Sequence, residues 1–265
     1  MGAIRFDNVG KVFGRANSGF AALEAVDLDI REREFVAIVG PSGCGKTTCL
    51  RMVAGFESVS SGRVLVNDRV VKAPGSDRAV VFQQFALFPW KTVRQNIEFG
   101  LRNKRTPRDE RNELVDDVLK LMTLESHRDA YPHQLSGGMQ QRVAIARAYV
   151  LDPDVLLMDE PFGALDAQTR VVMQEELVRL ARINPRTVLF ITHAVEEAVY
   201  LADRVAIMSR RPGTIKEVID VKTVRTSEDW DGFEKIEDVM DLESFVHLRT
   251  RIWKSLREEK VAVDG

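Results

Sequence analysis

The sequence predicts an α/β fold in which a largely parallel sheet is joined to an N-terminal antiparallel β subdomain and an inserted helical subdomain. Residues 36–39 and 155–158 are apolar at every position, as strands buried on both faces of a helix-covered sheet must be. Residues 4–9 and 25–30 alternate more between polar and apolar side chains, which suits an antiparallel edge. Between Thr92 and Val150 the apolar residues instead recur at helical spacing.

The remaining elements follow in order from short runs rich in β-branched residues. Further strands are predicted at residues 34–39, 63–66, 78–82, 187–191 and 204–208. Residues 86–150 are expected to form the helical subdomain, in which Leu114, Val118 and Leu121 are spaced for one apolar stripe. From Lys216 the hydrophobic density falls. We expect residues 216–265 to form a solvated C-terminal extension, in which an acidic segment with eight carboxylates between residues 228 and 243 pairs loosely with a basic helix.

Composition excludes several classes of protein. With 265 residues, of which 45% are hydrophobic and 29% charged, the chain is globular and long enough for one sizeable core. A formal net charge of −2 argues against nucleic acid as a partner. The longest apolar runs fall far short of the roughly 18 residues that crossing a bilayer requires. We expect no export or lipid signal, and the two cysteines, Cys44 and Cys49, suit a reducing cytosol better than a disulfide framework or a zinc site.

A phosphate-binding loop is predicted between the strand ending at Val39 and a helix-like segment at residues 47–54. The loop matches the pattern G-x-x-x-x-G-K-[ST]. Its glycines let successive N–H groups point inward, and the following helix N-terminus adds partial positive charge. Lys46 would reach the β- and γ-phosphates, and Thr47 would offer its hydroxyl to Mg²⁺. The nucleotide-binding residues are therefore predicted to be Gly40, Pro41, Ser42, Gly43, Cys44, Gly45, Lys46, Thr47 and Thr48.

This loop leaves two questions open. A glycine-rich turn without a ligand is the structural alternative, and kinases, GTPases and ATPases share the pattern. The oriented amides and Lys46 should favour the thiolate form of Cys44, so we expect its alkylation to block ATP binding, whereas an inert small side chain is the alternative.

Two adjacent acids, Asp159 and Glu160, end the second buried strand. On a parallel sheet they lie at the carboxyl edge, where ligands of open α/β sheets bind. Successive strand side chains point to opposite faces, so the two acids can serve different roles. Asp159 is expected in the Mg²⁺ shell and Glu160 is expected to polarise the attacking water, which favours hydrolysis over a kinase reaction. A solvated strand terminus is the alternative.

A second anion site is predicted at residues 135–142, where Ser136 is a good N-cap for the helix that follows. Two glycines in a first helical turn weaken it by roughly 1 kcal/mol each, and close approach of a ligand to the backbone would explain that cost. One ATP molecule does not need two separate phosphate-binding sites within one monomer. The residues expected here are Leu135, Ser136, Gly137, Gly138 and Gln140.

At this point the sequence resembles the ATPase subunits of ATP-binding cassette (ABC) transporters, which have a P-loop NTPase core of the RecA-like type. Residues 135–141 look like the signature motif of that family, which closes over the γ-phosphate held by the opposite subunit. The resemblance assigns further roles to four residues. They are a loop glutamine that touches Mg²⁺ and water at Gln83, a switch histidine at His193, a D-loop dimer contact at Asp166 and an adenine-stacking aromatic at Phe13.

The resemblance spans residues 1–215 and favours bacterial importers, with residues 87–96, 163–170 and 245–259 similar to the nitrate, sulfonate and taurine branch. It implies ATP and Mg²⁺ as ligands and a homodimer or a pair with a second ATPase subunit. It also implies two integral membrane permease subunits that dock on the aromatic residues 85–90, and indirectly a periplasmic or lipid-anchored substrate-binding protein. The expected location is peripheral, on the cytoplasmic face of the inner membrane.

Two other classes remain as alternatives. A soluble cassette ATPase that acts on DNA or ribosomes usually carries two cassettes or long insertions, and the near-neutral charge does not support it. A small-molecule kinase would leave residues 136–141, Asp166 and His193 without a role.

Overall fold

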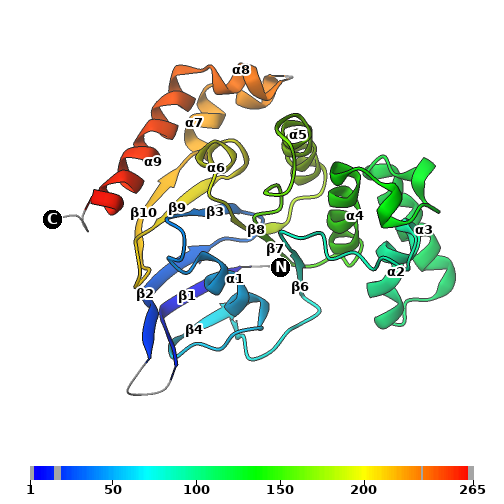
Figure 1. The fold of residues 1–265 in the computed structure, drawn as a ribbon, viewed down its shortest axis with the longest axis horizontal. Helices are drawn as coiled ribbons and strands as arrows, with labels where there is room; N and C mark the ends of the chain where they lie inside the picture. The colour runs from blue at the N-terminus through cyan, green and yellow to red at the C-terminus, as the bar shows by residue number, and fades with distance from the viewer. Residues whose placement is uncertain (1–2, 15–18, 234, 262–265) are drawn as a thin grey trace.

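A computed structural model describes residues 3–14, 19–233 and 235–261 and contains two sheets. The smaller sheet is antiparallel and has the strand order β2-β1-β4-β5. Figure 1 labels β2, β1 and β4 of this sheet. Its strands are β1 (Ile4–Phe13), β2 (Phe20–Ile30), β4 (Ser61–Val66) and β5 (Arg69–Val70). The antiparallel N-terminal sheet predicted from alternation is therefore confirmed, and β2 begins earlier than expected because Phe13 pairs with Phe20.

The larger sheet has the order β10-β9-β3-β8-β7-β6, and only β10 is antiparallel to its neighbour. Its strands are β3 (Phe35–Val39), β6 (Arg78–Val81), β7 (Val155–Asp159), β8 (Thr187–Ile191), β9 (Arg204–Met208) and β10 (Ile215–Asp220). Every predicted strand is present. The edge strand β10 was not predicted, because its residues are only partly buried and lack a continuous apolar run.

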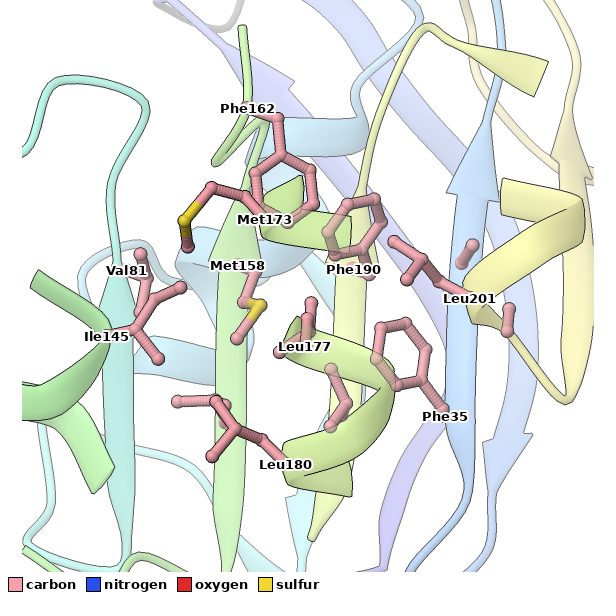
Figure 2. Close-up of a cluster of buried hydrophobic side chains, with 14 of the residues drawn as sticks. Phe35, Val81, Ile145, Met158, Phe162, Met173, Leu177, Leu180, Phe190 and Leu201 are labelled. Atoms are coloured by element: carbon pink, nitrogen blue, oxygen red, sulfur yellow. The ribbon is translucent and has the colours of Figure 1, made fainter. Parts of the chain in front are cut away.

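Both faces of the larger sheet are covered, which explains its apolar strands. Val36 and Ile38 face the smaller sheet and α1 (Lys46–Ala54), whereas Ala37 and Val39 face the opposite layer. That opposite layer is built from α4 (Gly137–Tyr149), α5 (Ala167–Ile183) and α6 (Val195–Leu201), and Figure 2 shows side chains of α4 and α5 meeting those of the sheet. The alternation follows from the two-residue period of a strand.

Two more helices, α2 (Val93–Asn103) and α3 (Arg108–Leu121), lie with α4 at one side of the molecule (Figure 1). The stripe predicted on α3 is confirmed at Val118 and Leu121, which pack against the core, and is wrong at Leu114, which is 36% exposed. The fully buried residues are Val115 and Leu119, because α3 turns this adjacent face toward the core. Short 3₁₀ turns at Glu125–His127 and Pro132–Gln134 connect α3 to α4. Among the described helices, none combines the length and apolar character that crossing a membrane requires.

The C-terminal region is packed on the core, so the expectation of a loosely paired, solvated extension is wrong. It contains α7 (Lys222–Ser227), a 3₁₀ turn at Trp230–Gly232, α8 (Ile236–Met240) and α9 (Glu243–Val261). Phe245 and Ile252 of α9 are fully buried, and α9 packs beside α6 (Figure 1). Apolar side chains spaced along an otherwise charged sequence hold the region in place.

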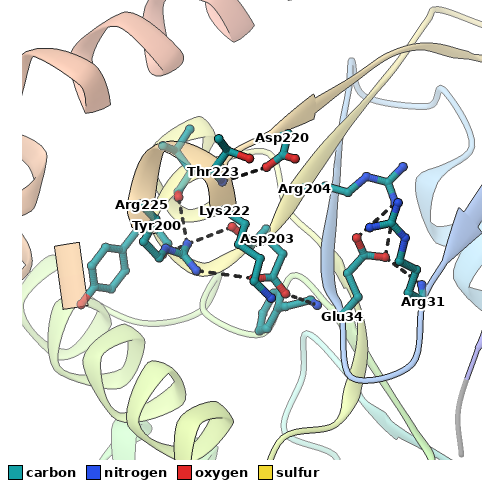
Figure 3. A network of polar contacts seen from close by, with 12 residues as sticks. Arg31, Glu34, Tyr200, Asp203, Arg204, Asp220, Lys222, Thr223 and Arg225 are labelled. Carbon is teal, nitrogen blue, oxygen red and sulfur yellow. Dashed lines mark hydrogen bonds and ion pairs between the residues drawn. The ribbon is translucent and has the colours of Figure 1, made fainter. Parts of the chain in front are cut away.

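A polar network joins the start of this C-terminal region to the sheet (Figure 3). Arg225 of α7 donates to the carbonyl oxygens of Tyr200 (2.7 Å) and Ala202 (2.9 Å), which end α6. Asp203 accepts from the backbone N–H of Phe35 (2.9 Å) and lies 3.7 Å from the Lys222 ammonium. The network therefore holds the C-terminal end of α6 against the start of β3.

Candidate active site

The predicted phosphate loop runs from the buried strand β3 to the first turn of α1. Gly43 (φ +76°) and Gly45 (φ +107°) have left-handed backbone conformations that other residues rarely adopt. The Lys46 ammonium donates to the carbonyl oxygens of Gly40 (2.8 Å) and Pro41 (3.0 Å), so it spans the loop. The loop lines a cavity of about 380 Å³, together with side chains from β1, β2 and the end of β7.

Thr47 and Asp159 meet at the sheet edge beside this loop. The Thr47 hydroxyl donates to Asp159 Oδ1 at 3.1 Å. Burial raises the pKa of the Asp159 carboxyl, Glu160 raises it further, and the hydrogen bond from Thr47 opposes both. Hydroxyl and carboxylate oxygens suit a hard cation such as Mg²⁺, which usually takes few protein ligands and completes its shell with water and phosphate oxygens. Within the described residues, no group of three or more His, Cys, Asp or Glu residues could hold a metal.

Glu160 and His193 lie together at the same edge. His193 Nδ1 is 3.1 Å from Glu160 Oε2, and the Glu160 side chain is 24% exposed. Glu160 has φ +47°, which is strained for a residue with a side chain, and such strain often marks functional sites. A carboxylate that also lines the cavity beside the phosphate loop is suited to act as a general base.

The position of His193 depends on a buried carboxylate that the sequence analysis missed. Glu197 on α6 accepts a 2.6 Å hydrogen bond from Thr192, the residue before His193, and its other oxygen lies 3.8 Å from Arg170 on α5. Burial raises the pKa of Glu197, and the hydrogen bond from Thr192 opposes the shift. The only sequence signal was an acid among apolar residues of a short helix.

Gln83 lies close to the loop that follows Glu160. A Cβ atom added at Gly163 would be 3.3 Å from Gln83 Nε2, and Gly163 N–H donates to the Glu160 carbonyl oxygen at 3.0 Å. The structure thus brings Gln83 next to the same turn as the carboxylate pair.

The aromatic side of the cavity contains more than the predicted Phe13. The rings of Phe13 and Phe20 are 5.7 Å apart, the Lys11 ammonium lies 4.9 Å from the Phe13 centroid, and the Arg211 guanidinium lies 4.5 Å from the Phe20 centroid. Phe20, Ala22 and Arg211 also line the cavity. The sequence analysis missed Phe20 and Arg211, although cross-strand pairing of Phe20 with Phe13 follows once the hairpin is recognised.

Residues of the predicted second anion site lie elsewhere, in a cavity of about 290 Å³ that shares no lining residue with the first. Ser136 caps α4 and accepts from the N–H of Met139 at 3.4 Å. Asp166 caps α5 and accepts from the N–H and hydroxyl of Thr169, and these bonds lower its pKa. Ser136, Gly138 and Thr169 line this cavity, so the starts of α4 and α5 meet there.

Two residues of these cavities differ from expectation. Gln140 was expected in the second anion site, but its amide donates to the carbonyl oxygens of Pro132 (3.0 Å) and Leu135 (3.2 Å). Met139 lines the 290 Å³ cavity in its place. Burial raises the pKa of the Cys44 thiol, with Lys46 opposing it, so the expected thiolate is wrong. Desolvation outweighs the charge of Lys46 because Cys44 is almost fully buried.

Comparisons with known proteins show a family to which the chain is similar in sequence and fold. A family model described as ABC transporter matches residues 23–163. The chain is 46% identical over 256 residues to the uncharacterized ABC transporter ATP-binding protein MJ0412 of Methanocaldococcus jannaschii, covering 97% of this chain and 92% of that protein. It is 48% identical over 204 residues to the taurine import ATP-binding protein TauB of Rhizobium johnstonii, covering 77% and 78% of the two chains.

Two further similarities concern import and structure. Over 230 residues the chain is 44% identical to the nitrate import ATP-binding protein NrtD of Synechococcus elongatus, covering 86% and 84% of the two chains. The fold matches the dimeric structure of a post-hydrolysis state of the ATP-binding cassette MJ0796 bound to ADP and Pi. That match has a TM-score of 0.71 and 32% identity and covers 82% of this chain and 98% of that one.

Proposed function

The chain belongs to the ABC transporter family of ATP-binding proteins, which hydrolyse ATP, and we propose that it is the ATPase subunit of an importer. The observation that carries the proposal is the separation of two cavities. One cavity is lined by the phosphate loop and Glu160, and the other is lined by the capped start of α4. Relatives named for taurine and nitrate import support a small anion or organic acid, such as nitrate, a sulfonate or taurine, as the transported substrate.

ATP binding in this proposal uses the phosphate loop, with Lys46 on the phosphates and Phe13 beside the adenine. Lys46 would exchange its two backbone carbonyl partners for phosphate oxygens, a stronger charge-assisted contact. The hydroxyl of Thr47 and the carboxylate of Asp159, 3.1 Å apart, would hold Mg²⁺. When bound, Mg²⁺ neutralises charge that develops on the β- and γ-phosphate oxygens.

Hydrolysis in this proposal uses Glu160 as the general base, with His193 and Gln83 beside it. The Glu160 carboxylate would orient a water molecule and accept its proton as the water attacks the γ-phosphorus. His193, 3.1 Å from that carboxylate, would hold it in place and contact the γ-phosphate. The buried Thr192–Glu197 hydrogen bond keeps the histidine loop in register with α6.

Two copies are proposed to act together, with residues 135–140 of each facing the nucleotide of the other and Asp166 at the contact. Bare amides at the capped start of α4 are suited to bind phosphate. The dimeric cassette with ADP and Pi supports this arrangement. Two integral membrane permease subunits and a periplasmic or lipid-anchored binding protein would complete the assembly. The chain would then be peripheral, on the cytoplasmic face of the inner membrane.

The proposed contact with the permease is the aromatic surface formed by residues 85–90. The rings of Phe88 and Trp90 have centroids 5.8 Å apart, and Trp90 is 70% exposed. Arg147 of α4 donates to the carbonyl oxygens of Phe85 (3.2 Å) and Ala86 (2.7 Å). Motion of α4 would therefore be passed to this surface. Within this proposal residues 1–215 form the cassette, with residues 86–150 as its helical part, and residues 216–265 form an extension.

The central test is Glu160→Gln. The variant should bind ATP with unchanged affinity, and its rate of phosphate release should fall by a factor of roughly 10² to 10⁴, the usual contribution of a general base. Glu32→Gln, an exposed change in the turn before β3, is the matched control and should keep the normal rate. Normal turnover by Glu160→Gln would show that another group is the base.

Transport is tested in cells from which the gene is deleted. Wild-type chain should restore uptake of labelled taurine or nitrate, and Glu160→Gln should not. Membrane fractions should also retain the wild-type chain through permease subunits, and Trp90→Ala should weaken that retention. ATPase activity without any membrane association would favour a soluble ABC ATPase that is not coupled to transport.

A further inference from the structure

The loop between β9 and β10, residues 209–214, is held against β2 and against the phosphate loop, which both line the proposed nucleotide cavity. Gly213 accepts from the N–H of Glu24 (3.0 Å) and donates to the carbonyl oxygen of Ala22 (2.9 Å), which ties it to β2. A Cβ atom at Gly213 would be 2.0 Å from the carbonyl oxygen of Cys44. Only glycine therefore allows this loop to approach the phosphate loop so closely.

Arg211 is carried by this loop to the boundary between two cavities. It lines the nucleotide cavity with Ser42 and Gly43, and the same three residues line a second cavity of about 770 Å³ that extends to His193 and Trp253. Its guanidinium lies 4.5 Å from the centroid of Phe20. In the part of the chain that the structure describes, Arg211 makes no ion pair with a carboxylate. Among the described residues, therefore, no carboxylate pairs with its positive charge beside the phosphate loop.

We propose that Arg211 binds the phosphate chain of the nucleotide, as a second cation in addition to Lys46. This inference rests on the proposed function and adds a residue to its site. The flat face of a guanidinium can stack on an aromatic ring while its N–H edge forms hydrogen bonds. Contact with Phe20 therefore orients Arg211 without using its donors, which stay available for phosphate oxygens.

The C-terminal helix α9 positions this arginine. Glu259 Oε2 accepts from the backbone N–H of Arg210 at 3.1 Å, and the other carboxylate oxygen lies 3.2 Å from the Lys216 ammonium. The helix itself is anchored by the buried side chains of Phe245 and Ile252. Glu259 thus connects the packed extension to the residue before Arg211, which gives the extension a role in nucleotide binding.

The first test measures the Kd of ATP for the full chain by calorimetry, with and without Mg²⁺. Arg211→Ala should raise the Kd about tenfold, the value of one charge-assisted hydrogen bond, and inorganic tripolyphosphate should lose affinity by a similar factor. Arg210→Ala is the matched control, because it removes the same charge from a side chain that lines only the 770 Å³ cavity. It should change the Kd less than about twofold, as expected for a weak long-range effect of charge.

Four results of that test would overturn the inference. Equal effects of Arg210→Ala and Arg211→Ala would indicate a general charge effect. Weaker ATP binding with unchanged tripolyphosphate binding would place Arg211 on the base or ribose. Unchanged ATP binding by Arg211→Ala would exclude a contact altogether while leaving the proposed function intact, whereas failure of the wild-type chain to bind ATP would contradict both.

The second test asks whether Glu259 acts through Arg211. Glu259→Ala should raise the ATP Kd by about two- to threefold, and this effect should disappear in an Arg211→Ala background, since coupled residues are not additive. Glu258→Ala is the matched control, because Glu258 pairs with Lys216 at 3.0 Å without touching the Arg210 backbone. An effect of Glu259→Ala that persists without Arg211 would contradict the positioning role.

Discussion

Replacing Gly138 by alanine places a methyl group 2.5 Å from Thr169 Cγ2, between the starts of α4 and α5. Carbon atoms in favourable contact are about 3.5–4.0 Å apart, so the helices must separate or Thr169 must leave its rotamer. Overpacking of this kind costs about 1–3 kcal/mol. The intrinsic helix preference of alanine offsets at most about 1 kcal/mol and less in a first turn, so we expect the free energy of unfolding to fall by roughly 1–2 kcal/mol.

Urea unfolding of the full chain measures this loss, and two variants make the reasoning specific. Gly137→Ala adds the same methyl group where the nearest atom is Leu165 Cδ2 at an ordinary 3.5 Å, so its free energy of unfolding should stay the same or rise by up to about 1 kcal/mol. Thr169→Ser removes the clashing Cγ2 and keeps the hydroxyl that donates to Asp166, so it should restore stability to Gly138→Ala.

The ATPase rate reports separately on the proposed interface between copies. We expect Gly138→Ala to lose at least tenfold in rate, because the displaced start of α4 would no longer present its amides to phosphate. Recovered stability without recovered activity in the Gly138→Ala, Thr169→Ser double variant would mean that the methyl group itself obstructs the nucleotide. A Gly138→Ala variant as stable as wild type, or one whose lost stability Thr169→Ser does not restore, would refute the packing argument.

Three other outcomes follow from the site. Burial raises the pKa of the Asp159 carboxyl, and the charge of Glu160 raises it further. The ionised carboxylate therefore lowers the free energy of unfolding at neutral pH. Asp159→Asn should therefore unfold at higher urea concentration at pH 7.5, and the gain should vanish as the pH falls below the ordinary aspartate range; a gain that grew in acid would contradict the sign. In a Cys49→Ser background, iodoacetamide should label Cys44 more slowly than free cysteine at pH 7.5, and fast labelling would restore the thiolate expectation. Gly213→Ala should weaken ATP binding by more than about tenfold, because a backbone oxygen 2.0 Å away cannot rotate aside, and unchanged affinity would show that the loop yields freely.

The strands of the parallel sheet could be predicted because their burial on both faces leaves a continuous apolar run, as in residues 36–39. The buried face of α3 could be predicted only in part, since Leu114 and Val115 are both apolar and adjacent, and only contact with neighbouring helices selects Val115. The C-terminal extension was mispredicted for a related reason. Its charges outnumber its apolar residues, yet Phe245, Leu248 and Ile252 recur on one helical face and suffice to pack α9.

The sequence by itself determined the chemistry of the site, because the phosphate loop, the Asp159–Glu160 pair and the capped start of α4 depend on local backbone and residue type. Only the tertiary structure decided which of these groups meet. It joins Glu160 to His193 across two strands and brings Arg211 from the β9–β10 loop onto Phe20. It also reverses the expected ionisation of Cys44. Such contacts depend on burial and on residues far apart in the chain, and neither is encoded in the spacing of a local motif.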